Sequence, residues 1–287
     1  MDNEDLLQRI AEQYKRMSKG QKLIADFILN NYDKAAFMTA SKIGQKVGVS
    51  ESTVVRFANM LGYEGYPQLQ KALQEVIRNK LTTVQRIEMT SELDESTLLK
   101  TVSKMDINNI RLTVEEINKE VFNRVVDRIF SARSIYVLGL RSAAPLAQFM
   151  GYYLSFIFEK VRVVTSGVND ILEQLIHIQP QDLLIGISFP RYARRTVEAM
   201  AFAKNKGAET VAITDSLLSP LTSYADHILL ARSDMASFVD SLVAPLSLIN
   251  ALIVAVGIRK KADISSDFQE LERIWGEYGV YIGKDGS

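Results

Sequence analysis

The sequence contains no cysteine and only two histidines, His177 and His227, among its 287 residues. Without cysteine the chain cannot form disulfide bridges, use a thiol nucleophile or bind zinc through thiolates. No cluster of cysteine and histidine is present, so the sequence predicts no metal site, and we expect neither a cofactor nor a catalytic residue. The missing cysteines also fit the reducing environment of the cytoplasm.

Long hydrophobic runs are absent as well. The longest apolar stretch, 242–258, has 17 residues and is interrupted by Pro245, Ser247 and Asn250. A bilayer crossing needs about 20 apolar residues, so we interpret this stretch as a buried helix and expect no membrane partner. The acidic residues of 1–5 are unlike a secretory signal, and we therefore expect a cytoplasmic protein.

The chain has no excess of charge of either sign, with 34 basic and 34 acidic residues. The charges are divided unevenly, however. Residues 1–80 carry 12 basic against 9 acidic residues, and residues 81–287 carry 22 against 25. A weakly basic first part beside a weakly acidic second part fits a DNA-binding domain joined to a sensor domain. The length also suits two domains.

The first 80 residues are predicted to be helical throughout. Apolar residues recur at three- and four-residue spacing from Leu6 onward. Ser18 begins a capping box, and Thr39 and Ser50 are predicted to cap two later helices. Gly62 is expected to end the helix that Ser50 begins. A further helix is predicted from Gln68 to about Lys80, with Pro67 near its start.

Residues 40–57 have the layout of a helix-turn-helix. Gly44 is small where two helices would cross, and Gly48 permits the positive φ that the tight turn needs. The polar residues at the start of the second helix would then enter the major groove of double-stranded DNA. An ordinary helical hairpin has the same apolar spacing and remains an alternative. The candidate DNA-binding residues are Ser50, Glu51, Ser52, Thr53 and Arg56.

From Ser134 onward, apolar runs of strand length alternate with helical patterns. Continuous Val, Ile and Leu runs between helices predict a doubly wound α/β domain of three layers with a parallel sheet. Such sheets bind ligands at the carboxyl ends of their strands, which here are followed by Gly139, Ser188 and Thr214. The expected strands are 135–138, 161–164, 183–187, 210–213 and 227–230, with helices such as 143–158 and 194–206 between them.

Several motifs closely resemble the RpiR/MurR family of bacterial regulators. In the first part they are Ser50-x-x-Thr-Val-Val-Arg-Phe57 and Leu61-Gly-Tyr-Glu-Gly-Tyr66. In the second part, Ile213-Thr-Asp-Ser216, Ser219-Pro-Leu221 and Ala225-Asp226 resemble the sugar isomerase (SIS) domain of that family. The segment from Gly62 to Tyr66 could form a wing, or its tyrosines could serve packing.

The resemblance implies a transcriptional repressor or activator that is a homodimer or homotetramer. Its SIS-type domain would bind a phosphorylated sugar or a related metabolite, and a dimer would read a palindromic operator. We accordingly expect a helix-turn-helix domain at 1–80, a helical connector at 81–118 and an SIS-type α/β effector-binding domain at 119–287. The later half of the connector is expected to form a helix of the second domain.

The ligand loops depart from the family pattern in a specific way. In SIS domains, a Gly-x-Gly-x-Ser turn and a Ser-x-Ser-Gly-x-Thr turn usually grip the ligand. Here Arg141 and Arg191 stand where glycines are usual, and arginine suits an anionic ligand. Ion pairs are an alternative role for the arginines, as turn formation is for the third loop. The candidate ligand-binding residues are Gly139, Arg141, Ser142, Ser188, Arg191, Thr214, Asp215 and Ser219.

Two other functions fit the same sequence less well. A sugar-phosphate isomerase or lyase could use the same α/β fold, but it needs a placed acid or base. His177, late in a predicted helix, and His227, at the start of a predicted strand, suggest surface or packing roles. A purely architectural DNA protein would have no use for the second domain. We therefore favour a regulator controlled by a small anionic metabolite, either a phosphosugar or an organic acid.

Overall fold

The computed structural model describes residues 6–36, 38–80, 83–88, 95–167, 170–235 and 239–282. The acidic residues 1–5 and part of the expected connector, 81–82 and 89–94, lie outside these ranges. The chain divides into two compact units, Met1–Ser91 and Glu92–Ser287, which are described separately below. No helix in the described part of the chain combines the length and apolar character needed to cross a membrane.

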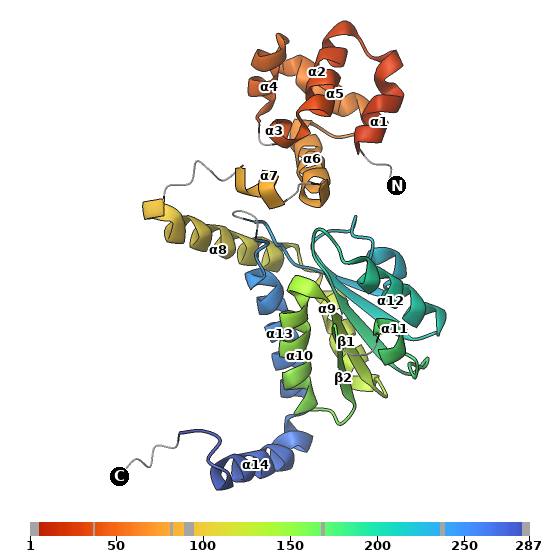
Figure 1. The fold of residues 1–287 in the computed structure, drawn as a ribbon, viewed down its shortest axis with the longest axis vertical. Helices are drawn as coiled ribbons and strands as arrows, with labels where there is room; N and C mark the ends of the chain where they lie inside the picture. The colour runs from red at the N-terminus through yellow and green to blue at the C-terminus, as the bar shows by residue number, and fades with distance from the viewer. Residues whose placement is uncertain are drawn as a thin grey trace. The chain divides into compact units, whose positions relative to one another are not determined.

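The first unit consists of helices (Figure 1). The sequence missed the short α3, and α6 begins at Tyr66 rather than Gln68, so that Pro67 lies in its first turn. The elements are α1 (Leu6–Gln13), the 3-10 turn η1 (Tyr14–Arg16), α2 (Lys19–Asn30), α3 (Tyr32–Ala35), α4 (Ala40–Val47), α5 (Glu51–Met60), α6 (Tyr66–Lys80) and α7 (Thr83–Glu88).

The glycines of the α4–α5 motif have the predicted roles. A Cβ atom on Gly44 would lie 2.7 Å from the carbonyl oxygen of Val49, so only glycine permits this close crossing. Gly48 has φ +74° and Gly62 has φ +88°, both in the left-handed region that favours glycine. Ser18 forms the predicted capping box, and the Thr39 side chain accepts a hydrogen bond from the backbone N–H of Lys42.

The turn between α5 and α6 contains no strand, so residues 62–66 do not form a wing. Tyr66 is buried, and its hydroxyl donates to the carbonyl oxygens of Met38 at 2.6 Å and Ala35 at 3.4 Å. The side chain therefore anchors α6 to the end of α3. Packing, the second interpretation of this segment, is the correct one for Tyr66.

The second unit has the predicted α/β fold, with five parallel strands in the order β2-β1-β3-β4-β5. The sequence placed every strand to within one residue at each end, but it missed α9 and α14. The elements are η2 (Glu95–Thr97), α8 (Leu98–Glu116), α9 (Lys119–Ser131), β1 (Ile135–Gly139), η3 (Arg141–Ala143), α10 (Ala144–Ser155), β2 (Val161–Val164), α11 (Ile171–Gln174), β3 (Leu183–Ile187), α12 (Arg194–Asn205), β4 (Glu209–Thr214), η4 (Thr222–Tyr224), β5 (His227–Leu230), α13 (Val243–Arg259) and α14 (Lys261–Glu277).

Alternate residues of the strands face two separate hydrophobic cores, which gives three layers. One core joins β1 residues such as Val137 to α9, α10 and α13. The other joins residues such as Tyr136 to α11 and α12. The apolar stretch 242–258 forms α13, whose inner side is buried in the first core as predicted. At Gly186 of β3 the sheet and α12 lie close together, since a Cβ there would lie 2.4 Å from the sulfur of Met200, and that side chain would have to move.

Candidate functional site

Helix α5 presents a polar surface at its N-terminal end. Val54, Phe57 and Ala58 on its opposite side are buried in the core of the first unit. Ser50, Glu51, Ser52 and Arg56 are exposed, and Thr53 is half-buried. The structure therefore brings all five candidate DNA-binding residues together on one end of one helix.

Hydrogen bonds tie these side chains to one another. The Ser50 hydroxyl lies 2.9 Å from the hydroxyls of both Ser52 and Thr53. The Arg56 guanidinium donates to the Thr53 hydroxyl at 3.4 Å and to the Ser52 carbonyl at 3.3 Å. Ser50 occupies the predicted Ncap position, but its side chain makes no capping bond, because it bonds the neighbouring hydroxyls instead. The first N–H groups of α5 therefore remain available to an acceptor such as a phosphate.

The second candidate site lies at the carboxyl edge of the sheet. Gly139 pairs with Ile187, and Ile187 with Ile213, so the loops after β1, β3 and β4 leave the sheet side by side. The backbone N–H of Ser188 donates to the Ile213 carbonyl at 3.2 Å. A Cβ on Gly139 would lie 2.5 Å from the Ala143 carbonyl, so this glycine lets the first loop fold tightly against its strand.

Arg141 and Arg191 are the two non-glycine residues of the described ranges with positive φ, at +56° and +62°. These are the two positions at which the family that the sequence resembles usually has glycine. Each conformation costs a non-glycine residue on the order of 1–3 kcal/mol, and such strain concentrates at functional sites. Both arginines are exposed, and the Arg141 side chain makes no hydrogen bond or ion pair with any described residue.

The serines of the first two loops differ from each other in their surroundings. Ser142 lies just before the helix that follows β1, where serine is a common cap, but it does not cap that helix. The 3-10 turn η3 places Ala143 at the Ncap of α10, and Ser142 is exposed without a capping bond. Ser188 is buried, beside the start of the second loop. The helix after that loop, α12, has Ala193 at its Ncap, and alanine offers no side-chain acceptor to the first N–H groups of the helix.

The third loop is linked to the second by Tyr192, which the sequence did not single out. Its hydroxyl donates to Asp215 Oδ1 at 2.8 Å, and the Thr214 hydroxyl donates to the same oxygen at 3.4 Å. Thr214, Asp215 and Ser219 are all buried, and the Ser219 hydroxyl accepts from the backbone N–H of Leu221. These three residues therefore shape the loop, and only the carboxylate of Asp215 reaches across to its neighbour.

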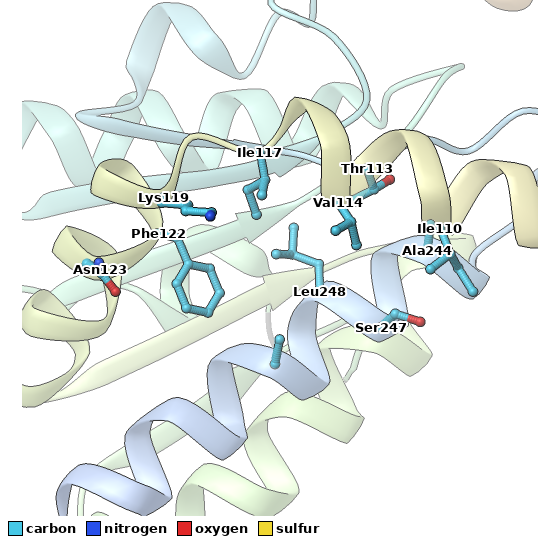
Figure 2. A pocket seen from close by; sticks show the side chains of 11 residues that line it. Ile110, Thr113, Val114, Ile117, Lys119, Phe122, Asn123, Ala244, Ser247 and Leu248 are labelled. Carbon is cyan, nitrogen blue, oxygen red and sulfur yellow. The ribbon is translucent and has the colours of Figure 1, made fainter.

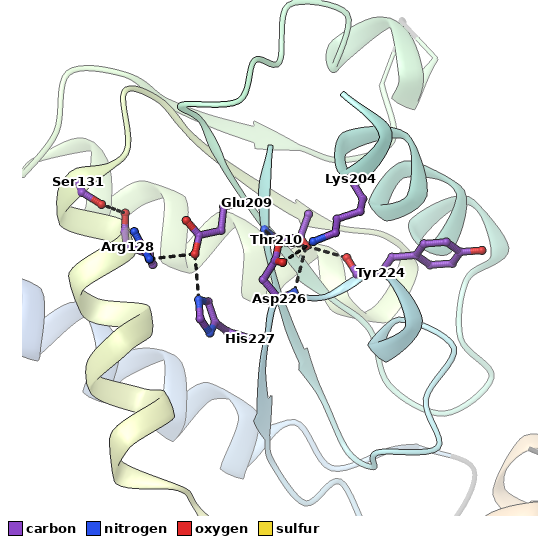
Figure 3. A network of polar contacts seen from close by, with 8 residues as sticks. All are labelled: Arg128, Ser131, Lys204, Glu209, Thr210, Tyr224, Asp226 and His227. Atoms are coloured by element: carbon purple, nitrogen blue, oxygen red, sulfur yellow. Dashed lines mark hydrogen bonds and ion pairs between the residues drawn. The ribbon is translucent and has the colours of Figure 1, made fainter. Parts of the chain in front are cut away.

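The opposite edge of the sheet holds a polar network (Figure 3). Glu209 Oε1 accepts from Arg128 Nε and lies 2.9 Å from His227 Nε2. His227 is thus at the other end of the strands from the ligand loops. His177 is exposed and lies in the turn after α11, not within a helix. In the described part of the chain, no group of three or more potential metal ligands lies together.

Asp226 in the same network explains the Ala225-Asp226 motif. Its carboxylate accepts from both the backbone N–H and the hydroxyl of Thr210 at 3.0 Å, and it pairs with Lys204. Burial alone would raise the pKa of Asp226, but the hydrogen bonds from Lys204 and Thr210 outweigh it and lower the pKa. Asp226 therefore holds the turn before β5 to β4.

Comparison with known families assigns both units. Residues 4–80 match the model of the helix-turn-helix domain of the rpiR family, and residues 128–255 match the model of the SIS domain. The first match contains α5, and the second contains the whole parallel sheet.

Individual proteins show the same two-part similarity. A helix-turn-helix transcriptional regulator of Haemophilus influenzae is 27% identical over 274 residues, covering 93% of this chain and 94% of that protein. The sugar isomerase domain of an RpiR transcription factor from Sphaerobacter thermophilus is 31% identical, with a TM-score of 0.59, covering 62% of this chain and 99% of that one. The NanR protein of Vibrio vulnificus, solved in complex with ManNAc-6P, has a TM-score of 0.59 at 20% identity and covers 97% of this chain and 100% of its own.

Proposed function

Because this chain belongs to the RpiR family of helix-turn-helix transcriptional regulators, we propose that α5 reads its operator and that the carboxyl edge of the sheet binds a small anionic effector. The relatives are named regulators, and the chain is a transcriptional regulator rather than a sugar-phosphate isomerase or lyase. The observation that carries the effector proposal is the pair of left-handed arginines at adjacent loops.

The topology of the sheet supports this location. In the order β2-β1-β3-β4-β5, chain direction across the sheet reverses between β1 and β3, and crevices at such switch points bind ligands in open α/β sheets. Arg141 and Arg191 follow these two strands. A guanidinium matches the geometry of a phosphate or carboxylate, and the uncapped start of α12 adds N–H donors and partial positive charge.

A ligand with hydroxyl groups fits the remaining polar groups best. Asp215 repels a bare anion but accepts hydrogen bonds from hydroxyls, and Ser188 can bond to either. NanR of Vibrio vulnificus, which shares the fold, was solved with ManNAc-6P, and this supports a phosphosugar ahead of an organic acid. We propose that the bound effector changes the affinity of the protein for DNA.

The DNA proposal predicts that Arg56→Ala weakens operator binding by roughly 5- to 150-fold, equivalent to about 1–3 kcal/mol for one base contact. Thr53→Ala should act in the same direction. Fluorescence anisotropy with operator and scrambled duplexes at fixed salt measures both effects. Arg16→Ala removes the same charge from an exposed position outside α5 and should lower binding to the two duplexes equally. Unchanged operator affinity for both α5 variants would show that the reading helix is misassigned.

The effector proposal predicts that Arg191→Ala abolishes the response to the metabolite but leaves effector-free operator affinity unchanged. A thermal-shift screen of sugar phosphates and small organic acids identifies the compound, because a ligand of the native state raises its stability. Loss of one charge-assisted contact, worth about 1.5–3 kcal/mol, should weaken the binding of that compound by roughly 10- to 150-fold.

Arg191→Gly is the matched control for backbone strain. It should lose the response equally, but it relieves the positive φ and should be more stable than Arg191→Ala, which keeps it. A normal effector response of either variant, or loss of the folded protein in both, would contradict a binding role for Arg191.

A further inference from the structure

Helix α8 buries polar residues and exposes aliphatic ones. Asn109 and Thr113 are buried, whereas Leu99, Ile107 and Val114 have exposed fractions of 83%, 65% and 66%. At 3.6 residues per turn, these three side chains fall within an arc of about 80° and form one apolar stripe along the helix. The exposed Ser103 lies between Leu99 and Ile107, so the stripe is a row of aliphatic side chains with one polar interruption, and an exposed apolar row of this kind marks an interaction surface.

The charged residues of α8 are arranged unfavourably with respect to the macrodipole of the helix. Lys100 and Lys104 lie in the first two turns, and Glu115 and Glu116 lie in the last turn. A helix is stabilised by the reverse arrangement, with acidic residues first and basic residues last. Neither lysine makes a hydrogen bond or ion pair with a described residue. Glu115 pairs with Arg111 of α8 and Glu116 pairs with Arg232, so the two lysines are the charges of this pattern that the subunit itself does not explain.

A pocket of about 310 Å³ opens beside the C-terminal half of the stripe (Figure 2). Val114 of α8, Ile117 directly after α8, Phe122 of α9 and Leu248 of α13 point into it, and its lining is mostly apolar. The other end of the stripe carries Leu99, the most exposed of the three aliphatic side chains. The same helix thus presents a projecting apolar side chain at one end and an apolar hollow at the other.

We propose that a second copy of this chain covers the stripe, with the two α8 helices packed antiparallel about a two-fold axis at Ile107. Along the helix, Leu99 lies about 12 Å to one side of Ile107 and Val114 about 10.5 Å to the other, at 1.5 Å per residue. The two-fold axis therefore brings Leu99 to the pocket beside Val114 of the partner subunit, and Lys100 opposite Glu115 of the partner subunit.

Self-complementarity favours a second copy over other occupants. A two-fold interface needs each feature and its complement on the same surface, on opposite sides of the axis. The surface around the stripe meets this condition twice. Leu99 is complementary to the pocket beside Val114, and Lys100 is complementary in charge to Glu115. A small apolar molecule in the pocket would leave the exposed Leu99, Ile107 and the two lysines unexplained. The proposed function supplies only the expectation of a homodimer. The proposed interface rests on that expectation and specifies which surface forms the dimer.

The absence of cysteine allows a direct test by disulfide formation in the full-length chain. Ile107→Cys should form a covalent dimer on mild oxidation, because residue 107 meets its own copy at the axis. Ile176→Cys is a matched control, since Ile176 is 59% exposed beyond α11 in the other helical layer, and it should stay monomeric on a non-reducing gel. Leu99→Cys should not crosslink by itself but should crosslink when mixed with Val114→Cys, which distinguishes antiparallel from parallel packing.

Sedimentation velocity provides the second measurement. Ile107→Glu places two like charges at the axis and should weaken dimerisation at least tenfold, while Ile176→Glu should leave it unchanged and circular dichroism should show both variants folded. A dimeric parent whose Ile107→Cys variant does not crosslink would overturn this interface and leave the proposed dimeric regulator intact. A parent that is monomeric at tens of micromolar would overturn the interface and the proposed dimer together.

Discussion

Tyr66 illustrates how one side chain holds the DNA-binding unit together. Its hydroxyl bridges the carbonyl oxygens of Met38 and Ala35, and Gln70 from the same helix also donates to Met38 at 3.0 Å. Burial raises the pKa of Tyr66 to about 12. The folded unit therefore favours the protonated phenol, which alone can donate these bonds.

Tyr66→Phe should destabilise the first unit by about 1 kcal/mol, because the Ala35 and Met38 carbonyls lose a donor. The parent should also lose stability as pH rises from 10, the ordinary pKa of tyrosine, to about 12, since the unfolded state ionises first. Urea unfolding followed by helical signal at pH 8 and at pH 11 measures both effects. The variant should lack the part of the alkaline loss that Tyr66 causes. Identical pH profiles for parent and variant would exclude that contribution.

At the scale of elements, α8 is fixed to the loop that follows β5. The Thr113 hydroxyl accepts from the backbone N–H of Arg232 at 2.9 Å and donates to the Asn109 carbonyl at 2.8 Å. The Asn109 amide donates to the carbonyl of Asp234, and the Arg232 guanidinium pairs with Glu116. These bonds account for the polar residues on the buried side of α8.

The same loop begins at the proposed effector edge. The backbone N–H of Ala231 donates to the carbonyl of Thr214 at 2.8 Å, at the end of β4. Hydrogen bonds thus connect the end of β4 to the loop after β5, and they connect that loop to α8. The stability of the contact between α8 and the loop is measurable without knowing the effector.

Thr113→Val should destabilise the second unit by about 1–3 kcal/mol, because the Arg232 N–H loses its buried acceptor while the side-chain volume is kept. Thr101→Val on the same helix is the control. Its hydroxyl makes no hydrogen bond with a described residue, so the change should have little effect. Chemical denaturation of the two variants beside the parent gives the comparison. Equal stabilities of all three proteins would show that the tether contributes nothing.

At the scale of the whole molecule, the uneven charge bears on how DNA is recognised. The first 80 residues have a net charge of only +3 and contain the one helix, α5, that we propose reads DNA. One small DNA-binding domain does not distinguish its genomic site from the many competing sequences. Two copies of the chain joined through their second units would double both the contacts and the length of sequence read.

We therefore predict a palindromic operator with half-sites about 10 base pairs, or a multiple of that, apart. Footprinting on a selected operator should show two symmetric protected segments, with two chains bound per duplex. Deleting one half-site should reduce affinity far more than mutating the spacer at constant length. A monomer that bound a single half-site specifically at micromolar concentration would contradict this prediction.

The sequence by itself determined the features that depend on neighbours along the chain. The capping box at Ser18, the turn at Gly48 and the alternation of strands and helices each arise within a few residues. The strand runs were recognisable because both faces of a parallel sheet are buried. The two arginines in the candidate ligand loops were also recognisable, because the family that the chain resembles usually has glycine there.

Only the tertiary structure decided which distant groups meet. The cap of α9 at Asn118 is a local signal that the sequence analysis did not use, and α3 is a single short turn. The turn η3 removed Ser142 from the helix cap, and the pairing of Tyr192 with Asp215 depends on two loops that adjacent strands bring together. The exposure of Leu99, Ile107 and Val114 likewise depends on which side of α8 packs on the loop after β5. A sequence shows which residues of a helix are apolar, but the packing of the rest of the chain selects the side that is left for a partner.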